Sequence, residues 1–232
     1  MSESQFETLA QLLGHLFKAH PWHGIPIGDK SPAIVNAYIE IVPSDTVKFE
    51  VDKATGHLRL DRPQRYSNVN PTLYGLVPQT YCGEKVAALC NDAMQRTDIV
   101  GDGDPLDICV LSEKTFSHGD FLMEAVPIGG IRMIDGYEAD DKIIAVMVDD
   151  ASFGDWKDLT ECPQSVIDRL THYFLTYKDA PGDTHREVEI AAFYGAYVAK
   201  DIIKRSVEDY QAKFPDPQEL LNSLSKVGTR EK

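Results

Sequence analysis

The stretch TVKFEVDKATGHLRLDR, residues 46–62, alternates apolar and polar side chains on both sides of a turn that contains a glycine. A period of two is typical of strands with one buried face, so these residues predict a β-hairpin. The preceding segment AYIEIV, residues 37–42, alternates in the same way. Together the three segments predict consecutive antiparallel strands.

Further strands are predicted along the chain at residues 105–112, 121–135 and 141–149. Many short strands separated by turns favour a closed barrel or a sandwich over a parallel sheet. Apolar residues at helical spacing predict helices at residues 5–18, 162–178 and about 191–214. We therefore expect a mainly β (α+β) fold, a five-stranded, OB-like closed β-barrel flanked by helices.

The expected organisation has three parts along the chain. An N-terminal helix and connector occupy residues 1–30, the barrel domain occupies residues 31–205, and the end of the last helix with a polar tail occupies residues 206–232. Residues 79–100 form an insertion within the barrel domain. No internal repeat interrupts this order.

Composition excludes several classes of protein. The formal net charge of −14 argues against non-specific binding to nucleic acid or to an anionic membrane. No apolar run is long enough to cross a bilayer, and the N-terminus lacks the features of a signal peptide, so we expect a cytoplasmic protein. The four cysteines contain no Cys-x-x-Cys pair and the seven histidines lack metal-ligand spacing, so neither a zinc site nor a disulfide framework is expected.

The segment VGDGDPLDICVL, residues 100–111, places Asp102, Asp104 and Asp107 within six positions. Carboxylates this close raise one another's cost of ionising, which indicates a positive group among them. An acidic surface turn is the alternative, because Asp, Gly and Pro are the commonest turn residues. A second acidic group, Asp135 and Asp140, precedes a strand. Oxygen ligands without His or Cys select Mg²⁺, Mn²⁺ or Ca²⁺ over zinc.

Basic residues accompany these aspartates. Lys48 and Glu50 lie two positions apart and so share one face of their strand, and Arg62 ends the next strand. Tyr177 and Lys178 close the predicted helix at 162–178. Lysines, an arginine and a tyrosine near a carboxylate-bound metal fit a phosphate site.

The motif DGDPLD resembles the Asp-x-Asp-Pro-hydrophobic-Asp signature of the soluble family I inorganic pyrophosphatases. Six other pieces occur in the order expected of that family: IEI, KFE, LDR, YG, DGYEADDK and YKD. The resemblance covers roughly residues 30–205. Asn70 stands where many members have a tyrosine, and the connection at about 79–100 is longer than the short bacterial one.

The resemblance implies hydrolysis of pyrophosphate to two orthophosphates by a metal-activated water, with Mg²⁺, or Mn²⁺ as a substitute, and a homo-oligomeric assembly. It assigns Asp104 as the general base, with Glu40 acting through metal-bound water and Glu50 supporting the site. The implied metal ligands are Asp102, Asp107, Asp135 and Asp140. The implied phosphate-binding residues are Lys48, Arg62, Lys142, Tyr177 and Lys178.

Some residues beside these motifs have simpler interpretations. Tyr74 can be a packing residue of the core. The ring of Tyr177 is expected to lie in the core even if its hydroxyl reaches the site. Asp141 and Glu138 are expected to be solvated neighbours of the ligands.

Three alternative functions fit the sequence less well than pyrophosphate hydrolysis. An EF-hand loop beginning at Asp102 requires an oxygen donor at position 106 and a glycine at position 107, where the chain has Leu106 and Asp107. An OB-like module that binds nucleic acid conflicts with the negative charge. A phosphatase that forms an aspartyl-phosphate usually has its nucleophile at the end of an apolar strand, whereas here the apolar run follows the motif.

Overall fold

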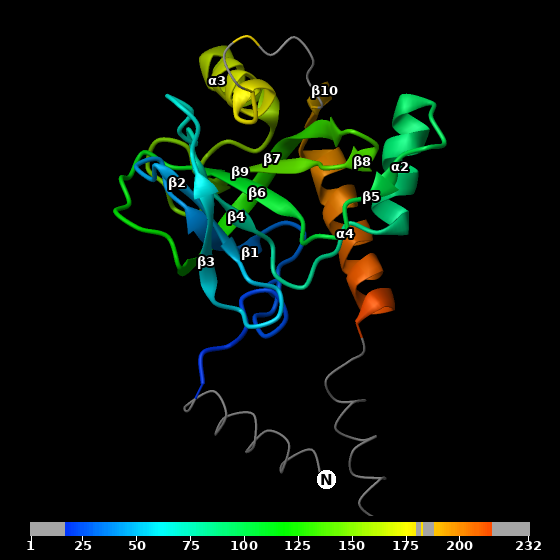
Figure 1. Ribbon diagram of the computed structural model, residues 1–232, viewed down its shortest axis with the longest axis horizontal. Helices are drawn as coiled ribbons and strands as arrows, with labels where there is room; N and C mark the ends of the chain where they lie inside the picture. The colour runs from blue at the N-terminus through cyan, green and yellow to red at the C-terminus, as the bar shows by residue number, and fades with distance from the viewer. Residues whose placement is uncertain (1–16, 180–181, 183–187, 215–232) are drawn as a thin grey trace, which may run out of the picture.

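The structure is a computed structural model that describes residues 17–179, 182 and 188–214 (Figure 1). The helix predicted at residues 5–18 lies outside the described residues except for its last two positions. The remaining predicted elements can be compared with the structure.

Five strands close into a ring, as the sequence predicted. Neighbours in the ring are β1 (Val35–Ile41), β4 (Leu73–Leu76), β6 (Asp107–Leu111), β9 (Lys142–Met147) and β7 (Phe121–Asp135). The strand β7 also pairs with β1 and completes the ring. The neighbours are antiparallel except β6 and β9, which run parallel. The mainly β fold with helices around a closed ring of five strands is thereby confirmed.

The hairpin predicted from residues 46–62 is present as β2 (Val47–Val51) and β3 (Leu58–Pro63), which form a separate two-stranded sheet. The prediction that residues 37–42 pair consecutively with this hairpin is wrong, because β1 pairs with β4 and β7 instead. A turn separates β1 from β2, in which the Val42 N–H donates to Asp45 Oδ2 at 2.8 Å. The hairpin therefore stands beside the ring.

Successive side chains along a strand point to opposite sides of the sheet, and in this ring both sides are buried. On β6 and β9, Ile108 and Ile143 belong to one apolar cluster, whereas Cys109 and Ile144 belong to another. Helix α3 (Gln164–Thr176) packs on the second cluster through Leu170 and other apolar residues. This arrangement carries the C-terminal end of α3 toward the face from which Asp107 and Lys142 project.

The other flank of the ring carries α4 (Ala196–Lys213) and α2 (Glu84–Met94), which lie side by side (Figure 1). Helix α2 lies within residues 79–100, the segment expected from the sequence to be an insertion, and the helix itself was not predicted. Asp209 of α4 caps it, since its carboxylate accepts the N–H groups of Gly83, Lys85 and Val86. Such a cap comes from a distant part of the chain, so no local signal marks it.

The helix predicted at about 191–214 begins only at Ala196, because residues 191–195 belong to β10 (Val188–Gly195). This strand pairs antiparallel with β7, and Tyr194 lies opposite Gly130. A Cβ at Gly130 would lie 2.4 Å from the Tyr194 ring. Because Gly130 has no side chain, the Tyr194 ring can approach β7 closely. This approach favours pairing of residues 191–195 with β7 over another turn of helix at the start of α4.

Short elements complete the described structure. They are the paired strands β5 (Val100–Gly101) and β8 (Glu138–Ala139) and a 3₁₀ helix at Leu159–Glu161. All four cysteines are free and buried. None of the helices within the described ranges has the length and apolar character needed to span a membrane.

Candidate active site

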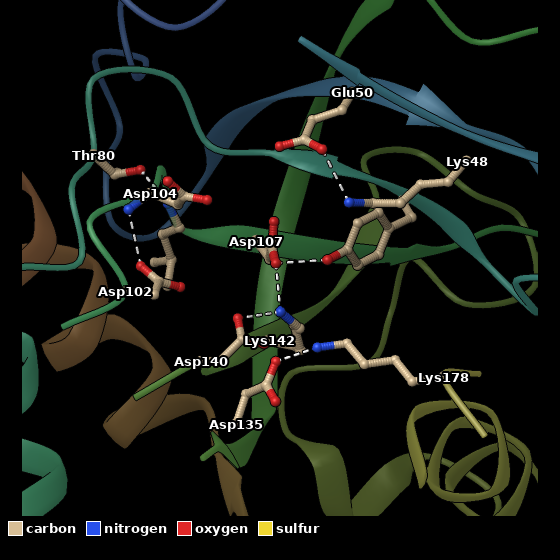
Figure 2. A network of polar contacts seen from close by, with 12 residues as sticks. Lys48, Glu50, Thr80, Asp102, Asp104, Asp107, Asp135, Asp140, Lys142 and Lys178 are labelled. Atoms are coloured by element: carbon tan, nitrogen blue, oxygen red, sulfur yellow. Dashed lines mark hydrogen bonds and ion pairs between the residues drawn. The ribbon is translucent and has the colours of Figure 1, made fainter. Parts of the chain in front are cut away.

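The structure brings the twelve site residues named from the sequence to one cavity of about 250 Å³. The cavity lies where β6 and β9 begin, and Figure 2 shows how its charged side chains point toward one another. The twelve are Glu40, Lys48, Glu50, Arg62, Asp102, Asp104, Asp107, Asp135, Asp140, Lys142, Tyr177 and Lys178. Strands, loops and a helix end far apart in the sequence therefore share one site.

The loop with three aspartates forms one wall of this cavity. Asp102 Oδ1 accepts the N–H of Asp104 at 2.9 Å, which shapes the turn. Asp107 is the first residue of β6, and its Oδ2 accepts the Tyr74 hydroxyl at 2.5 Å. Tyr74 is thus more than a packing residue, because its buried ring delivers a hydroxyl to the site.

Lys142 lies between the two acidic groups of the sequence. Its Nζ contacts Asp107 Oδ2 at 2.5 Å and also pairs with Asp140 (Figure 2). Only 3% of Lys142 is exposed. Burial alone would lower the pKa of this amine, but the two carboxylates outweigh it and raise the pKa well above its usual value. Lys178 pairs in the same way with Asp135.

The β2–β3 hairpin supplies cations to another wall. Lys48 Nζ lies 3.1 Å from Glu50 and 3.3 Å from Asp61, and Arg62 contacts Asp61 at 2.6 Å. The Arg62 guanidinium lies 5.9 Å from the centre of the Tyr177 ring. The Tyr177 ring is partly buried against the α3 side of the core and has this cation beside it.

Burial and neighbouring carboxylates raise the pKa of two acidic side chains in the site. Burial, opposed by a 2.6 Å hydrogen bond from the Val51 N–H, raises the pKa of Glu40 to about 8. Burial and the charge of Asp140 raise the pKa of Asp102 to about 8. Both carboxyl groups therefore hold their protons to a higher pH than an exposed carboxyl group does.

The donor set fits a hard divalent cation. Eight carboxylates and five cationic side chains line the cavity, and every carboxylate offers oxygen. Within the described ranges, no three acidic, His or Cys side chains are grouped to hold one ion. Lysines pair with several of the aspartates in this arrangement, so a cation would compete with Lys142 and Lys178 for the same oxygen atoms.

The expectation that Asp141 is solvated is wrong. Its side chain is 2% exposed and faces Arg132, with 3.8 Å between Nε and Oδ1. Asp141 lies between Asp140 and Lys142, and alternate residues of an extended chain point to opposite sides. It therefore projects away from the cavity, whereas its neighbour Glu138 is exposed and lies at the cavity edge.

Sequence reasoning missed Lys53, which lines the cavity and forms an ion pair with Asp104. The hairpin's run of charged residues was the available signal, since Lys53 directly follows β2. Asn70, the departure from the family pattern, is buried and does not line the cavity. Its Oδ1 accepts the Thr72 N–H at 3.1 Å and so shapes the turn before β4.

Comparison with known proteins agrees with this geometry. A sequence profile of the family described as Inorganic pyrophosphatase matches residues 37–211. The chain is 50% identical over 196 residues to an inorganic pyrophosphatase of Chlamydia trachomatis serovar L2, covering 83% of this chain and 94% of that protein. It is 37% identical over 194 residues to a soluble inorganic pyrophosphatase of Oryza sativa subsp. indica, covering 84% of this chain and 80% of that protein.

Solved structures give the same result. The inorganic pyrophosphatase of Thermus thermophilus superposes with a TM-score of 0.69 at 26% identity, covering 84% of this chain and 99% of that chain. The enzyme from Neisseria gonorrhoeae superposes with a TM-score of 0.67 at 30% identity, covering 81% and 96%. The family profile spans most of the chain and includes every charged residue that lines the cavity. The chain therefore belongs to the inorganic pyrophosphatases, hydrolases that act on pyrophosphate.

Proposed function

We propose that this chain hydrolyses pyrophosphate with the help of Mg²⁺, for which Mn²⁺ can substitute, at the cavity where β6 and β9 begin. The observation that carries the proposal is the mixture of eight carboxylates and five cationic side chains around one small cavity. Carboxylates suit a hard metal ion, and the cations suit the phosphate oxygens of the substrate. Neither set alone would accommodate a metal together with a highly charged anion.

Asp102, Asp107, Asp135 and Asp140 are the proposed metal ligands. Bound Mg²⁺ shields the charge of the phosphates and makes water a stronger nucleophile near neutral pH. Burial and the nearby charge of Asp140 raise the pKa of Asp102, and a bound divalent ion would stabilise the ionised form of this carboxyl group. The Tyr74 hydroxyl orients Asp107 by its 2.5 Å hydrogen bond.

Asp104 is the proposed general base that takes a proton from the attacking water. Its side chain is 39% exposed, against 15% for Asp140, so water can reach its oxygens. The ion pair with Lys53 fixes one oxygen, Oδ1. Glu40 and Glu50 line the same cavity and support the reaction by holding its water and cations in place.

The cationic side chains and one phenol would hold the substrate. Lys48 and Arg62 from the hairpin, Tyr177 and Lys178 from the end of α3, and Lys142 from the beginning of β9 all line this cavity. Donors fixed on separate elements around the cavity can hold one phosphate for attack and stabilise the charge that develops on the other. Each of them is paired with a carboxylate or an aromatic ring here, so its position is set before substrate arrives.

We also propose that the chain works as a homo-oligomer in the cytoplasm. Large apolar side chains stand exposed on several elements, with Tyr197 87% and Leu122 46% exposed. Four buried free thiols suit a reducing compartment. Light scattering on the purified protein would test the assembly, and a monomeric mass would contradict it.

The function is tested by phosphate release from pyrophosphate and, in parallel, from a phosphomonoester. We expect rapid hydrolysis of pyrophosphate with Mg²⁺ and slower hydrolysis with Mn²⁺. Chelation should abolish turnover, and Ca²⁺ should inhibit, because its larger and more flexible coordination suits the site poorly. Full activity in excess chelator would contradict the metal mechanism, and preference for the monoester would contradict the substrate.

A further inference from the structure

The segment 77–82 lies along the loop that carries the three aspartates. The Val77 N–H donates to Leu106 O at 2.9 Å, and the Cys82 N–H donates to Asp104 O at 2.8 Å. The Gly103 N–H returns a bond to Cys82 O at 3.1 Å. Three main-chain hydrogen bonds thus fasten the aspartate loop to a segment that supplies no metal or phosphate ligand.

Thr80, in the middle of that segment, is fully buried. Its hydroxyl donates to Val77 O at 2.6 Å and accepts the Leu106 N–H at 2.9 Å. Its carbonyl accepts the indole N–H of Trp22 at 2.7 Å. One residue therefore joins the aspartate loop to the N-terminal connector, and Figure 2 shows its hydroxyl beside the loop.

Leu106 is the critical position in the loop, because it lies between Asp104 and Asp107. Pro105 has no N–H to donate. Leu106 therefore supplies the main-chain N–H between Asp104 and Asp107. A buried main-chain N–H without an acceptor costs free energy. The Leu106 N–H therefore favours the loop conformation in which it donates to the Thr80 hydroxyl. The threonine hydroxyl is a stiff acceptor, because branching at Cβ restricts its rotation.

Elements outside the ring hold Thr80 in place. Trp22 is 4% exposed, and its ring stacks on His23 at 4.4 Å and meets the edge of Phe214 at 5.3 Å. The Tyr81 N–H donates to Ser206 O of α4 at 2.9 Å. The segment is thus braced from both sides.

We propose that Thr80 is a positioning residue, whose hydroxyl sets the placement of Asp104 and Asp107 through the main chain of Leu106. The proposal rests on the roles of base and metal ligand proposed above for these two aspartates. A misplacement of about 1 Å in an active site can cost about 10²-fold in rate. Loss of the hydroxyl should therefore affect turnover as well as folding.

The test compares Thr80→Val, which keeps the shape and loses the hydroxyl, with Thr80→Ser, which keeps the hydroxyl. At saturating Mg²⁺ and pyrophosphate, we expect kcat of Thr80→Val to fall by about 10²-fold with a smaller change in KM. Thr80→Ser should keep kcat within about 3-fold, since its hydroxyl can make the same two bonds. Ser206→Ala is the control, because it removes another fully buried hydroxyl, which donates to Ile203 O at 2.9 Å.

A readout without turnover separates this proposal from the proposed function. In the metal-free protein, hydrogen exchange of the Leu106 amide should speed up in Thr80→Val and stay near wild type in Thr80→Ser. Mg²⁺ binding measured by calorimetry should weaken only in Thr80→Val. A wild-type protein that does not hydrolyse pyrophosphate would contradict the proposed function, while the exchange and Mg²⁺ results would still decide the role of Thr80.

Wild-type kcat in a folded Thr80→Val would overturn the proposal, as would an equal loss in Thr80→Val and Thr80→Ser. A lower melting temperature with unchanged kcat, KM and Mg²⁺ affinity would make Thr80 merely structural and would also overturn it. Should Thr80→Val not fold, Trp22→Phe removes the indole N–H that donates to the Thr80 carbonyl. We expect it to lower kcat several-fold, and wild-type kcat there would overturn the proposal.

Discussion

Asp107 and Lys142 occupy matching register positions on the parallel strands β6 and β9, and their side chains meet at 2.5 Å. The ladder between the strands fixes this pair, and Lys142 also reaches Asp140. A buried ammonium thus lies between two proposed metal ligands, where a bound metal ion would compete with Lys142 for the carboxylate oxygens.

Replacing Lys142 by methionine should lower kcat by about 10²–10³-fold, the usual cost of one fixed donor to a developing charge. The metal-free variant should also melt at a lower temperature, because Asp107 and Asp140 then repel each other, and Mg²⁺ should restore part of the loss. Steady-state kinetics and thermal melts measure both effects. Lys85→Met is the control, since its ion pair with Glu208 is about half exposed and such pairs contribute little. A wild-type kcat for Lys142→Met would contradict the assignment.

The metal-free protein should lose stability as the pH rises. The pKa values of Glu40 and Asp102 are raised to about 8 in the folded chain, from ordinary values of 4.5 and 3.8. A carboxyl group with a raised pKa contributes stability that is complete below its unfolded pKa and is lost as the pH rises through its folded pKa. The stability of the metal-free protein should therefore fall between about pH 4 and about pH 8.

Thermal melts across that window, with chelator and with Mg²⁺, measure this effect. We expect the melting temperature in chelator to fall toward pH 8 and Mg²⁺ to reverse the fall, because it binds the ionised carboxylates. Glu40→Gln should flatten the profile in chelator. A melting temperature in chelator that rises steadily to pH 8 would show that the buried carboxylates do not govern stability.

The buried pair of Arg132 and Asp141 gives a prediction about folding. Arg132→Met alone leaves a buried carboxylate without its partner, which should cost about 3–5 kcal/mol at pH 8. The cost should be smaller at pH 5, because burial raises the pKa of Asp141 to about 7 and the group can then take up a proton. Urea unfolding at both pH values measures the difference.

The double variant Arg132→Met, Asp141→Leu is the matched control for that experiment. It removes both charges, so it should recover most of the lost stability at pH 8. A double variant as unstable as the single one would mean that shape, and not the unpaired charge, is responsible.

The sequence predicted those parts of the fold in which a local pattern matches a local structure. Alternation in residues 46–62 marked β2 and β3, the strand predicted at residues 121–135 corresponds to β7, and helical spacing marked α3. The beginning of α4 was misplaced because the strand β10 depends on pairing with β7 opposite Gly130. Helix α2 depends on a cap from Asp209, far away in the sequence.

The same contrast holds within the site. Two acidic groups at strand boundaries and the basic residues near them indicated a common site, and the resemblance to the pyrophosphatases implied the full set of site residues. Thr80 and Asp141 were not identified, since a hydroxyl and a carboxylate look alike in sequence whether they are buried or solvated. Their roles depend on Leu106 and Arg132, which the fold brings to them.

Asp104 and Asp107 have distinct proposed roles although they are close in sequence. Asp107→Asn keeps the shape and removes charge from the proposed metal ligands, so Mg²⁺ affinity should fall. Asp104→Asn removes the proposed base, and an amide cannot accept the proton, so the rate at saturating Mg²⁺ should fall by about 10²–10⁴-fold. Because neighbouring carboxylates titrate together, the pH profile of either variant belongs to the cluster.

The most direct test of this account is a Mg²⁺ titration of pyrophosphate hydrolysis by Asp104→Asn and Asp107→Asn, repeated across pH. The account predicts that excess Mg²⁺ restores much of the turnover of Asp107→Asn and little of that of Asp104→Asn, whose residual rate rises with pH as hydroxide replaces the base. Equal rescue of the two variants by Mg²⁺ would contradict it, because Asp104 would then be another metal ligand.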